Sequence, residues 1–415
     1  MSYRRIVLIL HHLRLPCESG GLRSFHILNQ FLQHREIFDE IILLVPSIDT
    51  LTGQESYLYK HRSNQLFSNI KIIFVKSLPF NKSNSLQRFA SFFIYSLVCC
   101  FKVLSINRCN GYMCTTYSLP VLLLTCIVSK LNNSLLFVEI RDLFLHGYIS
   151  SLRTSFITIF IKYSLYIFMR VESLCLRSAL LIFPNSPGFV PTLVYQYKIV
   201  PDKIKCILLG IDDYSNSYNI KPHISSKSRS LFQYSFDQAS QYQCNLVYCG
   251  SLDKVHSPAP LIQLCETINR RSLNIGVHLF GSSNSHLDIS NSFHFVHAYG
   301  NISKETLSYI LPIFDCGLYF SSQCFPFNAI LGNKIFDYIN AKIPTVFLTK
   351  SFAYHFSEVN NIGFKIDPLA VDQESVESMC AYAEINKSSL RNCADILKST
   401  KLCQTLVEHI LEKFI

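Results

Sequence analysis

The chain has 415 residues, 49% of them hydrophobic, which excludes a globally disordered protein and leaves room for two domains. The formal net charge of +10 is uneven, because residues 1–243 carry 25 Lys and Arg against 13 Asp and Glu, whereas residues 244–415 carry 13 against 15. The 16 cysteines include no Cys-x-x-Cys spacing, which argues against a zinc or redox motif and favours a reducing compartment.

The first half of the chain predicts alternating strands and helices. Apolar runs predict strands at residues 4–11, 40–46, 70–76, 111–114, 134–140 and 179–184. Helical periodicity predicts helices near residues 21–34, 85–104, 117–131, 154–177 and 187–196. We expect the short N-terminal apolar run to be a strand rather than a signal peptide, and no apolar stretch to reach the ~20 residues of a spanning helix.

A polar, Ser-rich segment at 215–243 predicts a linker or a long surface loop. The alternation then restarts, with strands expected at 245–250, 275–281, 293–300, 315–321 and 343–348. Helices are expected near 259–270 and 303–312, from Leu331-Gly332-Asn333 to before Pro344, and at the end of the chain. We therefore expect two tandem Rossmann-like, doubly wound α/β domains that face a cleft. The expected division is 1–210, a linker at 211–243, a second domain at 244–395, and a terminal helix at 396–415 that packs back on the first domain.

Two glycine-containing turns follow predicted strands. Gly20 and Gly21 open the helix near 21–34, where backbone amides favour an anion, although a simple tight turn explains them equally well. In the second half, Gly250 follows a strand, and Lys254 stands before the next helix. Lys254 is either a diphosphate ligand or a solvated loop lysine.

The segment "ILGNKIFDYINAKIPTVF", residues 330–347, predicts a helix that begins at Gly332 and Asn333 and buries one apolar face. Lys334 and Asp337 lie three residues apart and therefore share a face of this helix. They form either an ordinary solvated pair or a pair that holds the phosphate and hydroxyl groups of one ligand.

Between Glu55 and Glu139 the sequence contains no acidic residue, and its nine basic residues are mixed with aromatic and aliphatic ones. This pattern favours an anionic membrane surface as partner. Nucleic acid is disfavoured because the sequence lacks a recognition motif. A merely basic surface of a soluble protein remains the alternative.

Taken in order, these segments resemble family 4 of the glycosyltransferases, retaining enzymes of the GT-B fold, in the branch that builds bacterial surface polysaccharides. The resemblance lies in the Gly-Gly turn, "FVEIRDLFLHGYI" (137–149), the run at 170–213, "NLVYCGSLDKVHSPAPLI" (245–262), "FVHAYGNISKETLSYILPIFDCGLYFS" (295–321) and "GNKIFDYINAKIPTVF" (332–347).

The resemblance implies an acceptor-side first domain and a second domain that binds a nucleotide sugar. Its donor-binding positions are Gly20, Gly21, Gly250, Lys254, Gly332, Asn333, Lys334 and Asp337. Arg141, Asp142 and Asp337 are the implied catalytic residues. Hexosyl or N-acetylhexosaminyl transfer to a lipid-linked glycan, in lipopolysaccharide or capsule synthesis, is the expected reaction, with no metal ion and no cofactor. The expected location is the cytoplasm, at the inner face of the plasma membrane.

The sequence departs from the family pattern at several of these positions. Ala329 and Ser251 replace an expected acid and arginine, and Leu209 replaces an asparagine. A non-catalytic GT-B-like partner protein therefore stays open as an alternative, as does a nucleotide-sugar epimerase.

The membrane contact is expected to depend mainly on charge. We expect Arg88 and Lys102 to act with the basic residues of 153–177, and aromatic side chains nearby to insert. The aromatic candidates are Phe92, Phe93, Phe156 and Phe160.

Overall fold

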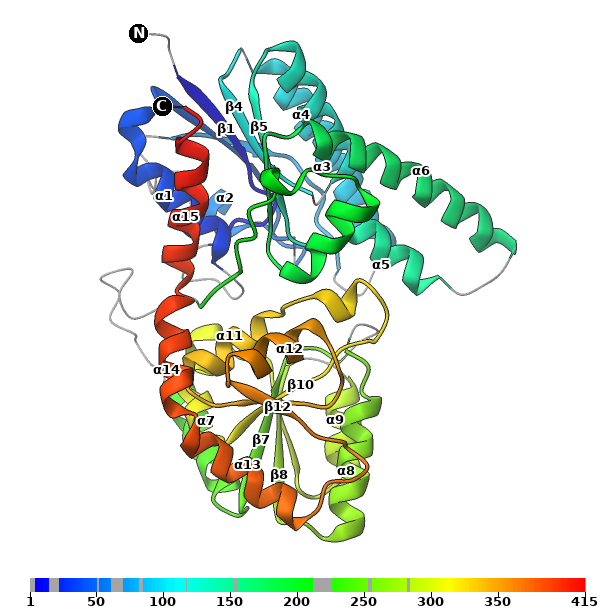
Figure 1. The fold of residues 1–415 in the computed structure, drawn as a ribbon, viewed down its shortest axis with the longest axis vertical. Helices are drawn as coiled ribbons and strands as arrows, with labels where there is room; N and C mark the ends of the chain where they lie inside the picture. Colours follow the sequence, from blue (N-terminus) through cyan, green and yellow to red (C-terminus); the bar gives the residue numbers. More distant parts are fainter. Residues whose placement is uncertain are drawn as a thin grey trace. The chain divides into compact units, whose positions relative to one another are not determined.

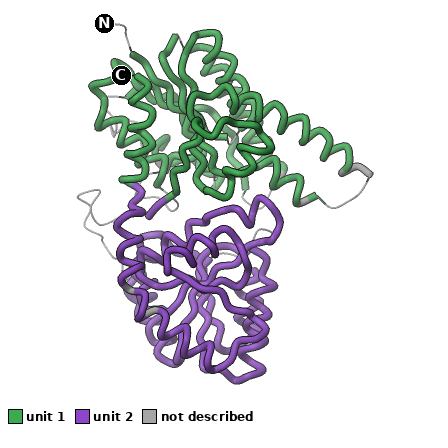
Figure 2. Tube along the Cα trace, viewed as in Figure 1, with its two compact units in different colours: residues 1–209, 400–415 green, residues 210–399 purple. Residues whose placement is uncertain are grey.

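The protein is represented by a computed structural model that describes residues 4–14, 22–50, 52–60, 70–81, 85–106, 108–116, 118–152, 156–211, 226–252, 256–281 and 284–414. The chain forms two compact units (Figure 2). Unit 1 comprises Met1–Leu209 together with Thr400–Ile415, and unit 2 comprises Gly210–Ser399.

Unit 1 is built on a six-stranded parallel sheet with the order β3-β2-β1-β4-β5-β6. Its strands are β1 (Arg5–Ile9), β2 (Glu40–Pro46), β3 (Lys71–Val75), β4 (Gly111–Thr115), β5 (Leu135–Ile140) and β6 (Leu181–Pro184). The central strands are apolar along their whole length because helices cover both faces of the sheet.

The helices of unit 1 are α1 (Arg23–Gln33), α2 (Tyr57–Lys60), α3 (Ser85–Ser105), α4 (Leu119–Leu131), α5 (Phe144–Ser151), α6 (Phe156–Ser178) and α15 (Ser399–Leu411). Figure 1 shows α1 and α15 on one side of the sheet and α3, α4 and α6 on the other. Right-handed crossovers produce this division, because the chain runs outward in one direction from β1 to β3 and in the other from β4 to β6. The packing of α15 into unit 1 confirms the expected return of the C-terminus to the first domain.

Unit 2 repeats the design, with the strand order β12-β11-β10-β7-β8-β9. The strands are β7 (Cys244–Cys249), β8 (Ile275–Phe280), β9 (Val296–Gly300), β10 (Cys316–Tyr319), β11 (Thr345–Phe347) and β12 (Gly363–Lys365). The helices are α7 (Ser226–Ala239), α8 (Ala259–Arg271), α9 (Asn284–Ser292), α10 (Lys304–Ile310), α11 (Asn333–Asn340), α12 (Phe352–Val359), α13 (Gln373–Ile385) and α14 (Lys387–Ile396).

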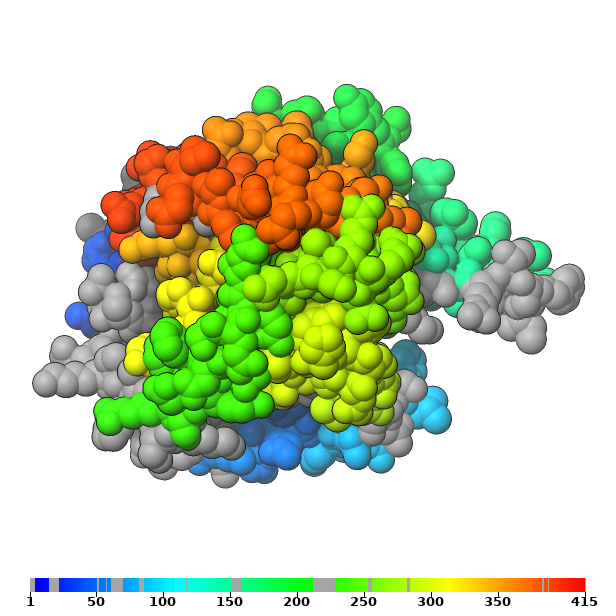
Figure 3. All heavy atoms as spheres, turned by 90° about the horizontal axis from the view of Figure 1, so that it is seen from below, coloured from blue at the N-terminus to red at the C-terminus, as the bar shows by residue number. Residues whose placement is uncertain are grey.

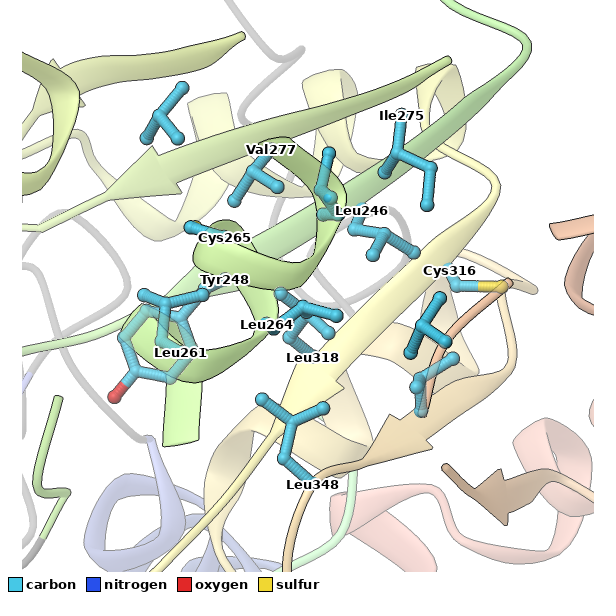
Figure 4. Close-up of a cluster of buried hydrophobic side chains, with 14 of the residues drawn as sticks. Leu246, Tyr248, Leu261, Leu264, Cys265, Ile275, Val277, Cys316, Leu318 and Leu348 are labelled. Carbon is cyan, nitrogen blue, oxygen red and sulfur yellow. The ribbon is translucent and has the colours of Figure 1, made fainter. Parts of the chain in front are cut away.

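Two hydrophobic clusters hold the helices of unit 2 against the two faces of its sheet. One cluster joins α8, α9 and α13 to the strands. Figure 4 shows Leu261 of α8 beside Tyr248 and Leu264 beside Leu318 of the sheet. The other joins α7, α10 and α11 to the opposite face. In the space-filling view of Figure 3, side chains of α7 (green), α8 (yellow-green) and α13 (orange) cover the face of unit 2 that is seen.

The predicted α/β class and the two parallel sheets are confirmed. Three local expectations were wrong. The segment predicted to be a linker contains α7, because Leu231 and Phe232 pack against the core. Residues 187–196 form 3₁₀ and π turns rather than an α-helix. Finally, α3 is long and apolar enough, by length and composition, to cross a membrane.

Candidate functional site

In unit 2, the carboxyl ends of β7 and β8 lie side by side, and a glycine follows each of these strands. Gly250 and Gly281, which follow these strands, have φ angles of +136° and +149°. A Cβ atom on Gly281 would lie 2.2 Å from the carbonyl oxygen of Gly250, so a side chain cannot be accommodated there. Ligands of doubly wound sheets bind at this edge, which is therefore the natural starting point for a site.

The Lys334 side chain lies against the end of β7, over Gly250 and the Tyr248 ring. A Cβ atom on Gly250 would lie 2.6 Å from Lys334 Cε, and Lys334 Nζ is 5.0 Å from the centre of the Tyr248 ring. Tyr248 is buried and stacks on Phe320. Glycine at 250 and the tyrosine face together hold the ammonium group at the end of β7 by close approach and a cation–π contact.

Helix α11 is fixed to the sheet by Tyr338. The Tyr338 hydroxyl lies 3.2 Å from the Val247 carbonyl oxygen and 3.1 Å from that of Leu318, either of which can accept its one hydrogen, and it accepts a hydrogen bond from the Cys249 amide at 3.2 Å. A Cβ atom on Gly317 would lie 2.3 Å from the Tyr338 ring. As predicted, the helix begins after Gly332, which has no side chain to cap the first amides, and the positive end of a helix favours an anion.

Asp337 faces α10, where its carboxylate forms an ion pair with Lys304. Both side chains are 23% exposed, and they line a pocket of about 270 Å³ with Phe336 and Asn340. The pKa of the Cys249 thiol is raised to about 12, first by burial and then by the charge of Asp337, against the lowering effect of Lys304 and Lys334. All three charges therefore act at the end of β7, and Lys334 and Asp337 belong to one charged cluster.

The structure adds residues that the sequence reading did not single out. Lys304, Tyr248, Gly281 and His286 join the cluster, and His286 Nδ1 lies 3.0 Å from the Gly281 carbonyl oxygen. Each of these residues except Tyr248 follows the end of a strand, so the strand-end rule could have found them. Gly20, Gly21 and Lys254 lie outside the described residues.

In unit 1, Arg141 belongs to a buried charge network at the end of β5. Arg141 Nε donates to Glu139 Oε2 at 3.0 Å, and Nη2 donates to Ser24 Oγ at 2.7 Å. Glu139 is fully buried and also pairs with Arg23, which donates to the carbonyls of Ile207 (3.0 Å) and Leu208. Glu139 therefore forms a buried salt bridge with both Arg23 and Arg141.

Asp142 comes next in the chain and has a perturbed acidity. Burial raises the pKa of its carboxyl group to about 6, and the positive charge of Arg141 opposes this rise. A carboxyl group with this pKa is a candidate acid or base near neutral pH.

Two histidines that the sequence reading did not single out lie at the end of β1. His11 is buried against Tyr95, with ring centres 4.3 Å apart, and His12 Nδ1 contacts the Thr50 hydroxyl. Burial lowers the pKa of both histidines, and the charge of Arg141 lowers both further. They line a pocket of about 300 Å³ with Arg14, which pairs with Asp49 at 2.6 Å. This edge of unit 1 thus carries neutral imidazoles beside Arg141.

Within the described residues, no group of three or more His, Cys, Asp or Glu is placed to hold a metal ion. The cysteines of the same part of the chain are free thiols.

Two tandem parallel α/β units of this order define the GT-B fold. Three solved structures resemble this chain over nearly their whole length. HepE of Anabaena in complex with UDP has a TM-score of 0.62 and 14% identity, over 99% of this chain and 100% of that one. WaaG, described as a glycosyltransferase involved in lipopolysaccharide biosynthesis, has a TM-score of 0.61 and 11% identity, over 98% and 99%.

The third is a trehalose-6-phosphate protein of E. coli bound with UDP-2-fluoro glucose, with a TM-score of 0.62 and 11% identity over 98% of both chains. No protein-family model and no curated protein matches the sequence. At these identities the likeness establishes the fold.

Proposed function

We propose that the protein is a glycosyltransferase that moves a sugar from a nucleotide-sugar donor to an acceptor. The observation that carries the proposal is the placement of Lys334 over Gly250 and Tyr248, beside the uncapped start of α11. A cation and the backbone amides of a helix N-terminus suit a diphosphate, whose charge increases as the sugar leaves. UDP or a UDP-sugar is bound in two proteins of the same fold, HepE and the E. coli protein.

Each residue of the cluster has a role in this proposal. Lys334 and the amides near Gly332 and Asn333 stabilise the leaving diphosphate. Asp337, oriented by Lys304, accepts hydrogen bonds from ribose or sugar hydroxyls. Lys254, Gly20 and Gly21 remain predicted donor ligands, because they follow strand ends in the sequence.

In unit 1, Asp142 and Arg141 are proposed to orient the acceptor hydroxyl, with Asp142 taking its proton. The raised pKa of Asp142 and the fixed position of Arg141 support these roles. Retention of configuration, transfer of a hexosyl or N-acetylhexosaminyl group and independence of metal ions follow from the family resemblance.

We further propose that the acceptor is a lipid-linked glycan and the product a surface polysaccharide, such as lipopolysaccharide or capsule. The enzyme would then act in the cytoplasm, at the inner face of the plasma membrane. The supporting observation is the stretch between Glu55 and Glu139, which is basic and without acids.

A non-catalytic GT-B-like protein is the second candidate, because Ala329 is buried where the family pattern expects an acid. Measurements of nucleotide binding and of sugar transfer distinguish the glycosyltransferase from the non-catalytic protein. We expect UDP, GDP or another nucleoside diphosphate to raise the melting temperature, and Asp337→Ala to reduce both binding and turnover. Excess EDTA should leave turnover intact. Nucleotide binding without any sugar transfer would favour the non-catalytic protein.

A further inference from the structure

The outer surface of α3, α4 and α6 is unusually apolar for a surface of a folded unit. On α3, six exposed side chains recur every three or four residues and form one stripe, with exposed fractions of 46–79%: Leu86, Phe89, Phe93, Leu97, Phe101 and Leu104. The opposite side of the same helix is buried at Tyr95, Cys99 and Val103. The helix thus packs on the sheet with one face and presents an apolar face outward.

The two neighbouring helices continue this surface. On α4, Leu123, Ile127 and Leu131 are exposed at four-residue spacing. On α6, the exposed residues Ile159, Tyr163, Tyr166, Ile167 and Leu174 share one side, and Phe160, Ile161 and Phe168 are exposed on its other sides. Because α3 packs on α4 and α4 packs on α6, the three helices form one layer on the same side of the sheet (Figure 1). We call this layer's outer surface the apolar face. Soluble proteins rarely leave so many large apolar side chains exposed together.

The charges around the apolar face are of one sign. Lys130 on α4 and Arg170 on α6 are exposed. Arg88 and Lys102, which the sequence led us to expect there, lie on the opposite side of α3 from the apolar stripe, and Arg88 lies over the Phe92 ring at 5.7 Å. In the described residues of 85–178, the acids are Glu139 and Glu172, which are buried, and Asp142, which follows β5. A symmetric contact with a second copy would bring these cations together, whereas a surface of lipid headgroups would complement them.

We propose that the apolar face binds one leaflet of a lipid bilayer without crossing it. Helices α3 and α6 lie along the headgroup–acyl boundary, and their apolar side chains insert into it. The contact is mainly apolar, and the cations add to it on anionic lipid. This proposal differs from the charge-driven docking expected from the sequence. The proposal does not rest on glycosyl transfer, since a non-catalytic chain would dock in the same way.

The fold excludes the alternative that α3 crosses the bilayer. Although α3 is the one helix in the described part of the chain with the length and composition to do so, it connects β3 and β4, which lie in the same sheet. A spanning α3 would place these strands on opposite sides of the membrane. The aromatic anchors also differ from expectation: Phe93 and Phe160 are exposed, at 55% and 63%, but Phe92 packs on His11 at 5.4 Å. The Phe156 side chain lies outside the described residues.

The absence of tryptophan from the chain makes a direct test possible. Phe93→Trp places a single reporter on α3, and Phe236→Trp, at a residue 50% exposed on α7 of unit 2, is its matched control. With phosphatidylcholine vesicles, we expect the emission of Phe93→Trp to shift to shorter wavelength and to be quenched by acyl-brominated lipid. The shift should persist at about 1 M NaCl, where exposed charges are screened. Phe236→Trp should show neither change.

A second set of variants separates apolar from ionic contacts. Phe89→Ser, Phe93→Ser and Phe101→Ser together should lower binding to phosphatidylcholine vesicles at least tenfold. Leu287→Ser, Val359→Ser and Ile385→Ser, exposed in unit 2, should leave it unchanged. Lys130→Gln with Arg170→Gln should remove only the additional affinity that phosphatidylglycerol confers.

Two results would overturn the proposal. One is binding of the wild type only to anionic vesicles and only at low salt, which would mean docking by charge. The other is a dimer in analytical ultracentrifugation that the triple serine variant dissociates, which would mean that a second copy covers the apolar face. Near-identical thermal unfolding of the variants and wild type would show that loss of binding is not loss of fold.

Discussion

At the residue scale, the sequence singled out Lys334 and Asp337 but could not show what each side chain contacts. The three-residue spacing places them on one side of α11. Their partners, Gly250 and Lys304, are contributed by segments 84 and 33 residues away, which no local pattern connects. The Gly250–Lys334 contact requires a glycine with positive φ at position 250. It also requires the position of α11 against the strands, which the Tyr338 hydrogen bonds fix.

Replacing Lys334 tests the proposed diphosphate contact. Lys334→Met keeps the aliphatic stem over Gly250 and removes the charge. A hydrogen bond to a charged group contributes about 1.5–3 kcal/mol, so we expect nucleoside diphosphate to bind roughly 10–100-fold more weakly by calorimetry. Lys350→Met, at an exposed position of the same unit, is the control. Equal affinity in wild type and Lys334→Met would remove Lys334 from the site.

Asp142 gives unit 1 a defined pH dependence. Because its folded pKa of about 6 lies above the ordinary value of 3.8, the folded state binds this proton more tightly than the unfolded state. The stability contributed by the protonated form is therefore lost as pH rises from about 4 through 6. Asp142→Asn should be more stable than wild type at about pH 8, by on the order of 1–3 kcal/mol, with no difference near pH 4. Urea unfolding at both pH values measures this, and a variant less stable at the higher pH would contradict it.

At the scale of elements, long periodic segments were predicted well and short ones poorly. The bounds of β2, α4 and α8 agree with the sequence reading to within two residues. The reading missed α5, α9 and α12, which have eight or nine residues and too few turns to establish a period. It misjudged α7 because a polar, Ser-rich exterior concealed the residues that pack on the core.

The buried ion pairs of Glu139 connect three segments of unit 1: α1, β5 and residues 207–208. Glu139→Gln would leave the charges of Arg23 and Arg141 without their buried partner. Breaking such a pair costs about 3–5 kcal/mol, which we expect to see in urea unfolding. Glu36→Gln, whose side chain is 67% exposed, should change stability by less than about 0.5 kcal/mol. A similarly small effect at Glu139 would show that the network contributes little.

At the scale of the whole molecule, the alternation of strands and helices was sufficient to predict two parallel α/β units. The order of strands within each sheet was not readable from the sequence, because it depends on long-range crossovers. Unit 1 is also discontinuous in sequence. Leu406, Val407 and Ile410 of α15 are fully buried in it, and Phe414 packs over Gly111, where a Cβ atom would lie 2.6 Å from its ring.

This discontinuity predicts that α15 stabilises unit 1 selectively. Ile410→Ala removes buried methyl groups and should cost about 2–5 kcal/mol. Hydrogen exchange resolves the two units, so protection should fall in β1 and β4 while β7 and β8 keep theirs. Glu412→Ala, at an exposed position three residues from the chain end, is the control. Equal loss of protection in both units would show that they unfold as one.

The central claim is that the carboxyl edge of unit 2 binds a nucleotide sugar and directs transfer of its sugar. The most direct measurement is release of nucleoside diphosphate from a panel of nucleotide sugars, with and without lipid-linked glycan acceptors, with product configuration determined by NMR. The proposal predicts acceptor-dependent release matched by sugar addition with retained configuration, and its loss in Lys334→Met. Failure of wild-type protein to bind or turn over any donor of the panel would contradict the claim.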